Sequence, residues 1–133
     1  MKRLNSILIL TAIILLGVSC TASDTKAPNV IETYPVSGSI DVDPSTPEII
    51  VTFDEPMKDG NWSWAYSDED KFPEMTGQPY YKPGHTINIL PVKLEPDKEY
   101  EIWINSEKFK NFKDQAGNSA TPFRLVFTTG ETL

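Results

Sequence analysis

Eleven prolines occur in this chain, all after residue 27, and they limit what it can fold into. Each proline removes a backbone N–H donor and clashes with the preceding helical turn, so long helices are excluded. Between the prolines and glycines, apolar residues recur at every second position, which is typical of half-buried β-strands. These runs are 30–34, 49–53, 62–66, 87–89, 100–104 and 123–127. The pattern predicts an all-β sandwich of about seven short strands, with at most one helical turn near 106–109.

The first 19 residues have a different character from the rest. Lys2 and Arg3 precede an apolar run, Leu4 to Leu16, that is shorter than the roughly 20 residues needed to cross a membrane. Small residues follow, and this order is that of a secretory signal. The segment Gly17-Val18-Ser19-Cys20 resembles the lipobox of bacterial lipoproteins, although Gly17 stands where a large aliphatic residue is usual. The resemblance implies that Cys20 carries a lipid and begins the mature chain.

Cys20 is the only cysteine, so no disulfide within the chain can stabilise the fold. Cleavage at a nearby position would instead leave a free thiol, which is unusual in an oxidising compartment. We therefore expect a lipoprotein signal peptide at 1–19, a lipidated tether at 20–27 and one domain at 28–130. The expected location is the bacterial cell envelope, with the lipid in the outer membrane and either face possible.

The charge balance restricts the partners. The formal net charge is −7, and it becomes −9 once Lys2 and Arg3 are removed with the signal. An acidic domain lacks the clustered cations that nucleic acid requires, and it does not dock on anionic lipid. Membrane contact is then expected through the lipid on Cys20 alone.

Four segments occur in an order that is informative together. They are Ala27-Pro28-Asn29-Val30 with Tyr34-Pro35-Val36-Ser37-Gly38, then Ile49-Ile50-Val51-Thr52-Phe53-Asp54-Glu55-Pro56-Met57, then Leu94-Glu95-Pro96-Asp97-Lys98-Glu99-Tyr100, and finally Phe112-Lys113-Asp114-Gln115-Ala116-Gly117-Asn118 leading to Phe127-Thr128-Thr129-Gly130. The set resembles the bacterial Ig-like domain of the SbsA type. The resemblance implies an immunoglobulin-like β-sandwich without catalytic activity, used as a spacer on cell surfaces. A single domain behind a lipid departs from that arrangement, because it has nothing to space.

Two of these segments are also predicted to form turns on physical grounds. In Asp54-Glu55-Pro56, proline favours a turn and the Asp54 carboxylate is expected to accept from the amides that follow it. In the segment 114–118, Asp114 is expected to cap a turn in which Gly117 takes a positive φ.

The sequence offers no catalytic set, and we expect no enzyme. His85 is the only histidine and lies in a turn, and no serine has the Gly-X-Ser-X-Gly setting of a nucleophile. Zinc would lack its ligands. Calcium needs several converging oxygens, and the candidates are Asp41 with Asp43, the acids at 68–70, and Asp114 with Asn118. None has the spacing of a known calcium loop, so we expect no metal or cofactor, with structural calcium as the remaining alternative.

The aromatic residues are the one feature that suggests a ligand. Trp62, Trp64 and Tyr66 would share one face of a strand, and Tyr80, Tyr81 and Trp103 complete the candidate set. Trp103 should point away from the core side of its strand, to be exposed or to lie under the 106–112 loop. A shared face of aromatics fits a sandwich core, and it also fits an exposed strip that stacks sugar rings or anchors a protein.

The leading hypothesis is therefore a non-catalytic cell-envelope lipoprotein module with a structural or protein-contact role. The alternative is a carbohydrate-binding module at the cell surface that uses the Trp and Tyr side chains. A third hypothesis is pairing through an open sheet edge, although the sequence does not indicate which edge.

Overall fold

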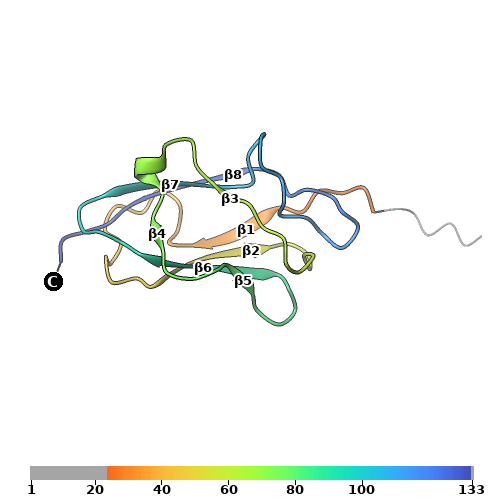
Figure 1. The fold of residues 1–133 in the computed structure, drawn as a ribbon, viewed down its shortest axis with the longest axis horizontal. Helices are drawn as coiled ribbons and strands as arrows, with labels where there is room; N and C mark the ends of the chain where they lie inside the picture. Colours follow the sequence, from red (N-terminus) through yellow and green to blue (C-terminus); the bar gives the residue numbers. More distant parts are fainter. Residues whose placement is uncertain (1–23, 133) are drawn as a thin grey trace, which may run out of the picture.

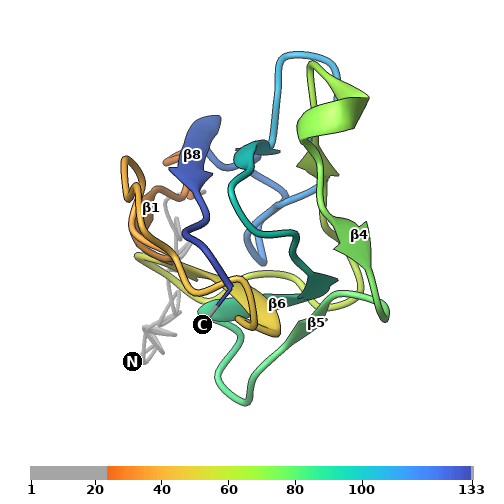
Figure 2. The same ribbon diagram turned by 90° about the vertical axis from the view of Figure 1, so that its left-hand side faces the viewer.

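The computed structural model describes residues 24–132, which form two antiparallel sheets packed face to face (Figures 1 and 2). In the first sheet, β1 (Val30–Tyr34), β2 (Glu48–Phe53) and β6 (Ile87–Lys93) lie in that order, and the short β4 (Glu74–Met75) and β5 (Tyr80–Tyr81) both pair with β6. The second sheet has the order β3 (Trp64–Ala65), β7 (Glu99–Ile104) and β8 (Phe123–Thr128). The predicted all-β sandwich is confirmed.

Two local predictions are wrong. The strand expected over 62–66 is reduced to the two residues of β3. The single helical turn is η1 (Glu69–Lys71), where the Asp68 carboxylate accepts from the Asp70 amide, and not the 106–109 segment. Pro91 lies inside β6, opposite Glu48 of β2. The strand continues through it because Pro91 still offers its carbonyl, which accepts a hydrogen bond from the Thr76 amide at 3.1 Å.

The core fills the space between the sheets in two adjoining clusters. Alternate residues of each long strand point inward, as their period of two requires. The first cluster contains Val42, Ile49, Leu90, Val92, Leu94, Tyr100, Ile102, Leu125 and Phe127. The second contains Val51, Phe53, Met57, Ile104, Phe112 and Ala120. Phe112 and Ala120 belong to the long β7–β8 connection, so this connection is part of the core and not a surface loop.

An apolar row crosses the outer face of the first sheet. Tyr34 pairs with Ile50, Ile50 with Ile89, and Ile89 with Tyr80, so the four side chains stand in one register line across β1, β2, β6 and β5. We call this row the outer ladder. Its two ends are open to solvent, with Tyr34 52% and Tyr80 47% exposed. Cross-strand neighbours of this kind stabilise a sheet, but exposed tyrosines at both ends also offer an apolar contact surface.

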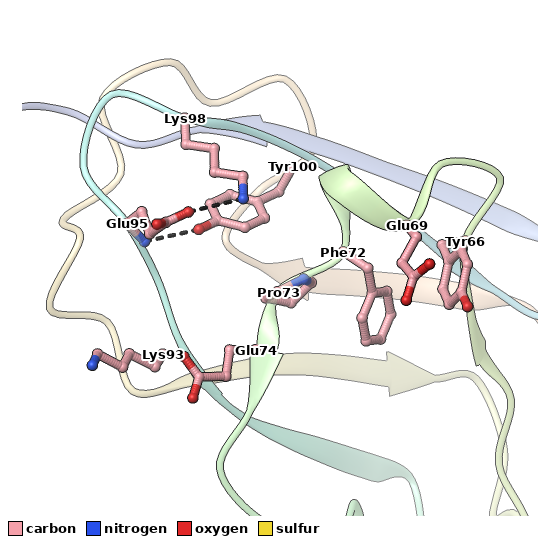
Figure 3. Close-up of a pocket in the computed structure, with 9 residues that line it drawn as sticks. All are labelled: Tyr66, Glu69, Phe72, Pro73, Glu74, Lys93, Glu95, Lys98 and Tyr100. Carbon is pink, nitrogen blue, oxygen red and sulfur yellow. Dashed lines mark hydrogen bonds and ion pairs between the residues drawn. The ribbon is translucent and has the colours of Figure 1, made fainter.

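Tyr100 closes the corner that leads into β7. Its hydroxyl accepts a hydrogen bond from the Glu95 amide at 2.8 Å (Figure 3). Its ring stacks on Phe127, with centroids 5.3 Å apart. The Lys98 ammonium lies 5.2 Å from the ring centroid. A tyrosine hydroxyl bonded to backbone a few residues upstream is a recurrent corner of immunoglobulin-like sandwiches.

We expect Tyr100→Phe to destabilise the fold by about 1 kcal/mol, because the Glu95 amide loses its acceptor while the ring packing is retained. Urea denaturation followed by tryptophan fluorescence measures the change. Tyr81→Phe is the matched control, since the Tyr81 hydroxyl makes only a 3.4 Å contact with the Asn61 carbonyl. Equal losses in the two variants would show that the corner bond has no special role.

Candidate functional site

A hollow of the described surface runs beside β3. It has a volume of about 640 Å³, and we call it the aromatic groove. Its apolar walls are formed by Trp62, Trp64, Tyr66, Met75, Pro79 and Phe109. These residues come from three separate segments: β3 with its flanks, the chain from β4 to β5, and the connection after β7. The groove therefore exists only in the folded chain.

Trp64 is only partly available to a ligand in this groove. Its indole Nε1 donates to Asn88 Oδ1 at 2.9 Å, and its ring meets Phe112 edge-on with centroids 5.6 Å apart. Trp64 thus reaches from the second sheet to β6 of the first and packs against both core clusters. Its main role is to join the two sheets, with one side of the ring left facing the groove. Within the described residues, Asn88 Nδ2 is buried without a hydrogen-bond partner.

Tyr66 is the most exposed of the three predicted aromatics in this segment, whereas Trp62 and Trp64 are both half-buried. Tyr66 is 49% exposed and packs against Phe72, with ring centroids 5.4 Å apart. It borders the aromatic groove and two other hollows, one of them lined also by Trp103. Trp62 is half-buried and packs against the second core cluster.

The remaining predicted aromatics lie elsewhere. Tyr80 belongs to the outer ladder, while Tyr81 pairs with Asn88 and so faces the opposite side of the sheet. Burial raises the pKa of the Tyr81 hydroxyl, with the Asp59 charge adding to the effect. Trp103 is half-buried in a hollow of about 380 Å³ beside Ser106 and Glu107. The six candidates therefore do not form one continuous strip.

A second, more polar hollow of about 430 Å³ lies on the other side of Tyr66 (Figure 3). Lys98 forms an ion pair with Glu95 at 2.9 Å near its rim. Hydrogen bonding to Lys98 holds the pKa of Glu95 below its ordinary value. The charges of Lys98 and Glu95 at this rim thus partly neutralise each other. The sequence pattern did not predict this hollow, because the residues that line it are far apart along the chain.

Glu101 is a polar centre on the outer face of the second sheet that the sequence analysis also missed. Its carboxylate accepts from Ser67 Oγ at 2.5 Å and from Arg124 Nη2 at 2.6 Å. The hydrogen bonds from Ser67 and Arg124 hold the pKa of Glu101 below its ordinary value. The side chain of Glu101 is nearly buried, so these bonds fix the orientation of β3, β7 and β8 on that face.

His85 lies in a turn, as predicted. Its amide donates to the Lys82 carbonyl at 3.0 Å, its carbonyl accepts from Met57, and its φ is 56°. Its ring lies against Tyr81, with centroids 5.9 Å apart. In residues 24–132 no hydrogen bond joins this imidazole to a serine hydroxyl or a carboxylate, so the arrangement offers no nucleophile–base pair.

The predicted turn at 114–118 forms, and the one at 54–57 differs from expectation. Asp114 Oδ1 accepts from the Asn118 amide at 2.8 Å, and Gly117 has a φ of 89°. Asp54 Oδ1 instead accepts from the amide of Asn29, 25 positions away, at 2.9 Å. The prediction failed because the start of β1 lies beside the end of β2 and competes for the carboxylate.

Three carboxylates meet where these two turns lie together. One oxygen from each of Asp24, Glu55 and Asp114 lies within 4.8 Å of the others. Burial raises the pKa of Glu55, and the Asp114 charge raises it further. Burial would also raise the pKa of Asp114, but hydrogen bonds from Asn118 outweigh it and hold that pKa below the ordinary value. Asp114 also accepts from the amide and from Nδ2 of Asn118, and calcium takes six to eight oxygens, so the three carboxylates would form only part of a calcium site.

We expect Glu55→Gln to stabilise the domain at pH 7 by about 0.5 kcal/mol. A raised folded-state pKa means that ionisation of Glu55 opposes folding, so stability is lost as the pH rises above about 4.5. The gain should disappear at pH 3, where Glu55 is protonated. Thermal unfolding at the two pH values measures the effect, and Glu32→Gln on exposed β1 is the control. A lower melting temperature for Glu55→Gln at pH 7 would show that the Glu55 charge is not repelled by Asp114 in the folded state.

The match to a protein family agrees with this architecture. Residues 24–129 match the family described as bacterial Ig-like domain, so the chain belongs to that family. Similar solved structures include surface layer protein SbsC, domains 1-6, and the S-layer protein rSbsC, each with 15% sequence identity and a TM-score of 0.43. The two alignments cover 82% and 81% of this chain and 14% of each S-layer chain, so this chain spans about one seventh of their length. No curated protein matches.

Proposed function

We propose that this protein is a non-catalytic module of the bacterial cell envelope that is anchored by a lipid on Cys20 and contacts a partner protein. The chain belongs to the family of bacterial Ig-like domains, which supports a structural or protein-contact module at the cell surface. The observation that carries the contact role is the outer ladder, where Tyr34 and Tyr80 expose apolar rings on a regular sheet face. Exposed tyrosines are favoured at protein interfaces.

The anchor itself lies outside the described residues, because Cys20 and the signal at 1–19 precede residue 24. The shape of the domain supports the proposal indirectly. The first described residues leave one end of the long axis, and the C-terminus lies toward the other (Figure 1). The Asp24 carbonyl is held there by Asn118 Nδ2 at 2.9 Å. A short tether would therefore place the outer ladder along the side of a domain that projects from the membrane. None of the described helical segments is long and apolar enough to cross a membrane.

The carbohydrate alternative receives weaker support. A sugar ring can stack only on an aromatic side chain whose ring face is free. Trp64 is tied inward by its bond to Asn88, and Tyr80 and Trp103 lie on other faces. Only Trp62 and Tyr66 remain as neighbours that could receive a sugar.

Replacing Cys20 with serine tests the anchor. We expect the wild-type chain to partition into the Triton X-114 phase and to incorporate labelled palmitate in bacterial cells. Cys20→Ser should do neither, because a thioether cannot form at serine. A palmitate-labelled Cys20→Ser chain, or an unlabelled wild-type chain, would contradict lipidation at this residue.

The contact role is tested by photo-crosslinking in cells. A photoreactive residue at Tyr34 or Tyr80 should give a discrete crosslinked protein, and one at exposed Lys58 should not. Adding Ile50→Asp to the crosslinking variant should abolish the product, because it places a charge in the middle of the ladder. Identical products from all positions would remove the support for a contact on this face.

A further inference from the structure

The two edges of the second sheet are treated differently. The free edge of β8 is covered by the segment 37–42. The Gly38 amide donates to the Val126 carbonyl at 2.6 Å, and the Thr128 amide donates to Ser39 at 2.8 Å. The Val42 amide then donates to the Thr128 carbonyl at 3.1 Å. The backbone groups on this side are thereby satisfied, and β8 cannot accept a further strand.

The opposite edge, formed by β3, remains open. In an antiparallel pair, residues alternate between those whose backbone groups face the partner strand and those whose groups face away. The Asn105 amide donates to the Ser63 carbonyl at 3.0 Å, so Ser63 faces β7. Trp64, which pairs with Ile104, must then direct its N–H and C=O away from β7. Among the described residues, no other backbone group bonds to them.

The aromatic groove lies directly beside this open edge. Tyr66, Met75 and Phe109 line it and are 49%, 41% and 50% exposed, which is a high exposure for apolar side chains gathered in one hollow. Lys108 is the only charged residue among the described residues that line it. No carboxylate in residues 24–132 forms an ion pair with Lys108, whereas the chain as a whole is acidic. The groove thus offers apolar contact, free backbone groups and one unpaired positive charge.

We propose that β3 accepts an extended peptide segment of a partner protein as an added strand. The peptide backbone bonds to the Trp64 N–H and C=O, its alternate apolar side chains enter the aromatic groove, and an acidic residue of the peptide meets Lys108. Strand addition uses main-chain bonds for affinity and pockets for alternate side chains for specificity. This inference rests on the proposed protein-contact function and assigns a second, separate surface to it.

A peptide fits these observations better than a sugar does. A sugar would use the ring faces and leave the Trp64 backbone groups unpaired. A peptide satisfies those groups and also explains the apolar lining contributed by Met75, whose side chain has no ring face on which a sugar can stack.

The experiment selects 12-residue peptides from a random phage-displayed library against the purified full-length chain in detergent. The selected sequence is then synthesised in three forms: unmodified, N-methylated at the odd-numbered amides, and N-methylated at the even-numbered amides. Each N-methylated form cannot donate backbone hydrogen bonds along one of its two edges. We expect enrichment of alternating apolar residues with an acidic residue, and loss of binding in one of the two N-methylation registers. We also expect protection of the Trp64 amide from hydrogen exchange when the peptide is bound.

Two groove variants and their controls locate the contact. Phe109→Ala and Lys108→Glu should each weaken binding by about tenfold. Lys110→Glu is the matched control, because Lys110 is exposed on the same segment but does not line the groove. An unchanged melting temperature in each variant shows that the fold is retained.

Several results would overturn the inference. These are an unenriched library, selected peptides that are indifferent to N-methylation in both registers, or peptides that bind Lys108→Glu as well as wild type. Binding of a cell-wall polysaccharide that is weakened by Phe109→Ala without protection of the Trp64 amide would assign the groove to carbohydrate. If the groove fails while crosslinking at Tyr34 and Tyr80 succeeds, the proposed function survives and only the β3 site is lost. Failure at both surfaces removes both proposals.

Discussion

Replacing Asn105 with alanine is expected to destabilise the protein by at least about 3 kcal/mol. The Asn105 side chain is fully buried and makes three hydrogen bonds in the β7–β8 connection. Its Nδ2 donates to the Phe112 and Ala120 carbonyls at 3.0 Å each, and its Oδ1 accepts from the Phe112 amide at 2.9 Å. Alanine leaves these three backbone groups buried without partners, and each costs about 1–3 kcal/mol. The total free energy of unfolding of a typical domain is only about 5–15 kcal/mol.

The backbone of Asn105 adds to the expected loss. Its φ is 56°, in the left-handed region that asparagine tolerates better than alanine. Urea unfolding of the purified chain measures the change. Asn105→Asp is a second variant that retains an acceptor for the Phe112 amide but removes both N–H donors, so it should also be strongly destabilised. Asn29→Ala at the exposed start of β1 is the control and should change stability little. A stable Asn105→Ala chain would mean that the connection can rearrange to satisfy its own backbone.

The second large loss of stability is expected for Phe112→Ala, which should lower the free energy of unfolding by about 4 kcal/mol. Phe112 is completely buried although it lies outside every strand. Its ring meets Phe53 at 5.2 Å and Trp64 at 5.6 Å between centroids, so it fills the space between the two sheets at one end. Removing it leaves a cavity that the strands on both sides cannot close without giving up their register. Chemical denaturation measures the loss.

Phe109→Ala provides the matched control for this effect. Phe109 lies three residues earlier in the same connection and is half exposed, so its loss should cost less than about 0.5 kcal/mol. The pair separates burial from the general effect of removing a phenylalanine from this segment. Similar losses at the two positions would contradict the assignment of Phe112 to the core. The effects of Phe112→Ala and Asn105→Ala should not add, because the two residues share hydrogen bonds.

The strands with a clear period of two were predictable because the pattern is local. The runs around Val51, Ile102 and Leu125 became β2, β7 and β8, and the resemblance to bacterial Ig-like domains gave the correct family. The short strands were not predictable. Glu74–Met75 and Tyr80–Tyr81 are strands only because β6 offers them backbone partners, and a two-residue strand has no pattern of its own.

For the candidate sites too, the sequence predicted what lies close together along the chain and missed what long-range packing brings together. The sequence suggested that Trp62, Trp64 and Tyr66 belong together, and they do line one groove. Their neighbours Met75 and Phe109 come from distant segments with no distinguishing sequence signal. Glu55 was considered only as part of a turn, and its meeting with Asp24 and Asp114 depends on long-range packing of three segments.

The sequence by itself determined the class of fold, since dense prolines exclude long helices and alternating apolar residues specify two-sided strands. It also determined that the core needs no disulfide, because only one cysteine is present. The tertiary structure alone decided which sheet edge is covered and which is open. That choice depends on the 37–42 segment, which bonds to the outer edge of β8, while within residues 24–132 no segment bonds to the backbone of Trp64 on the outer edge of β3. Contacts between residues about 90 positions apart, such as Ser37 with Val126, leave no trace in a local pattern.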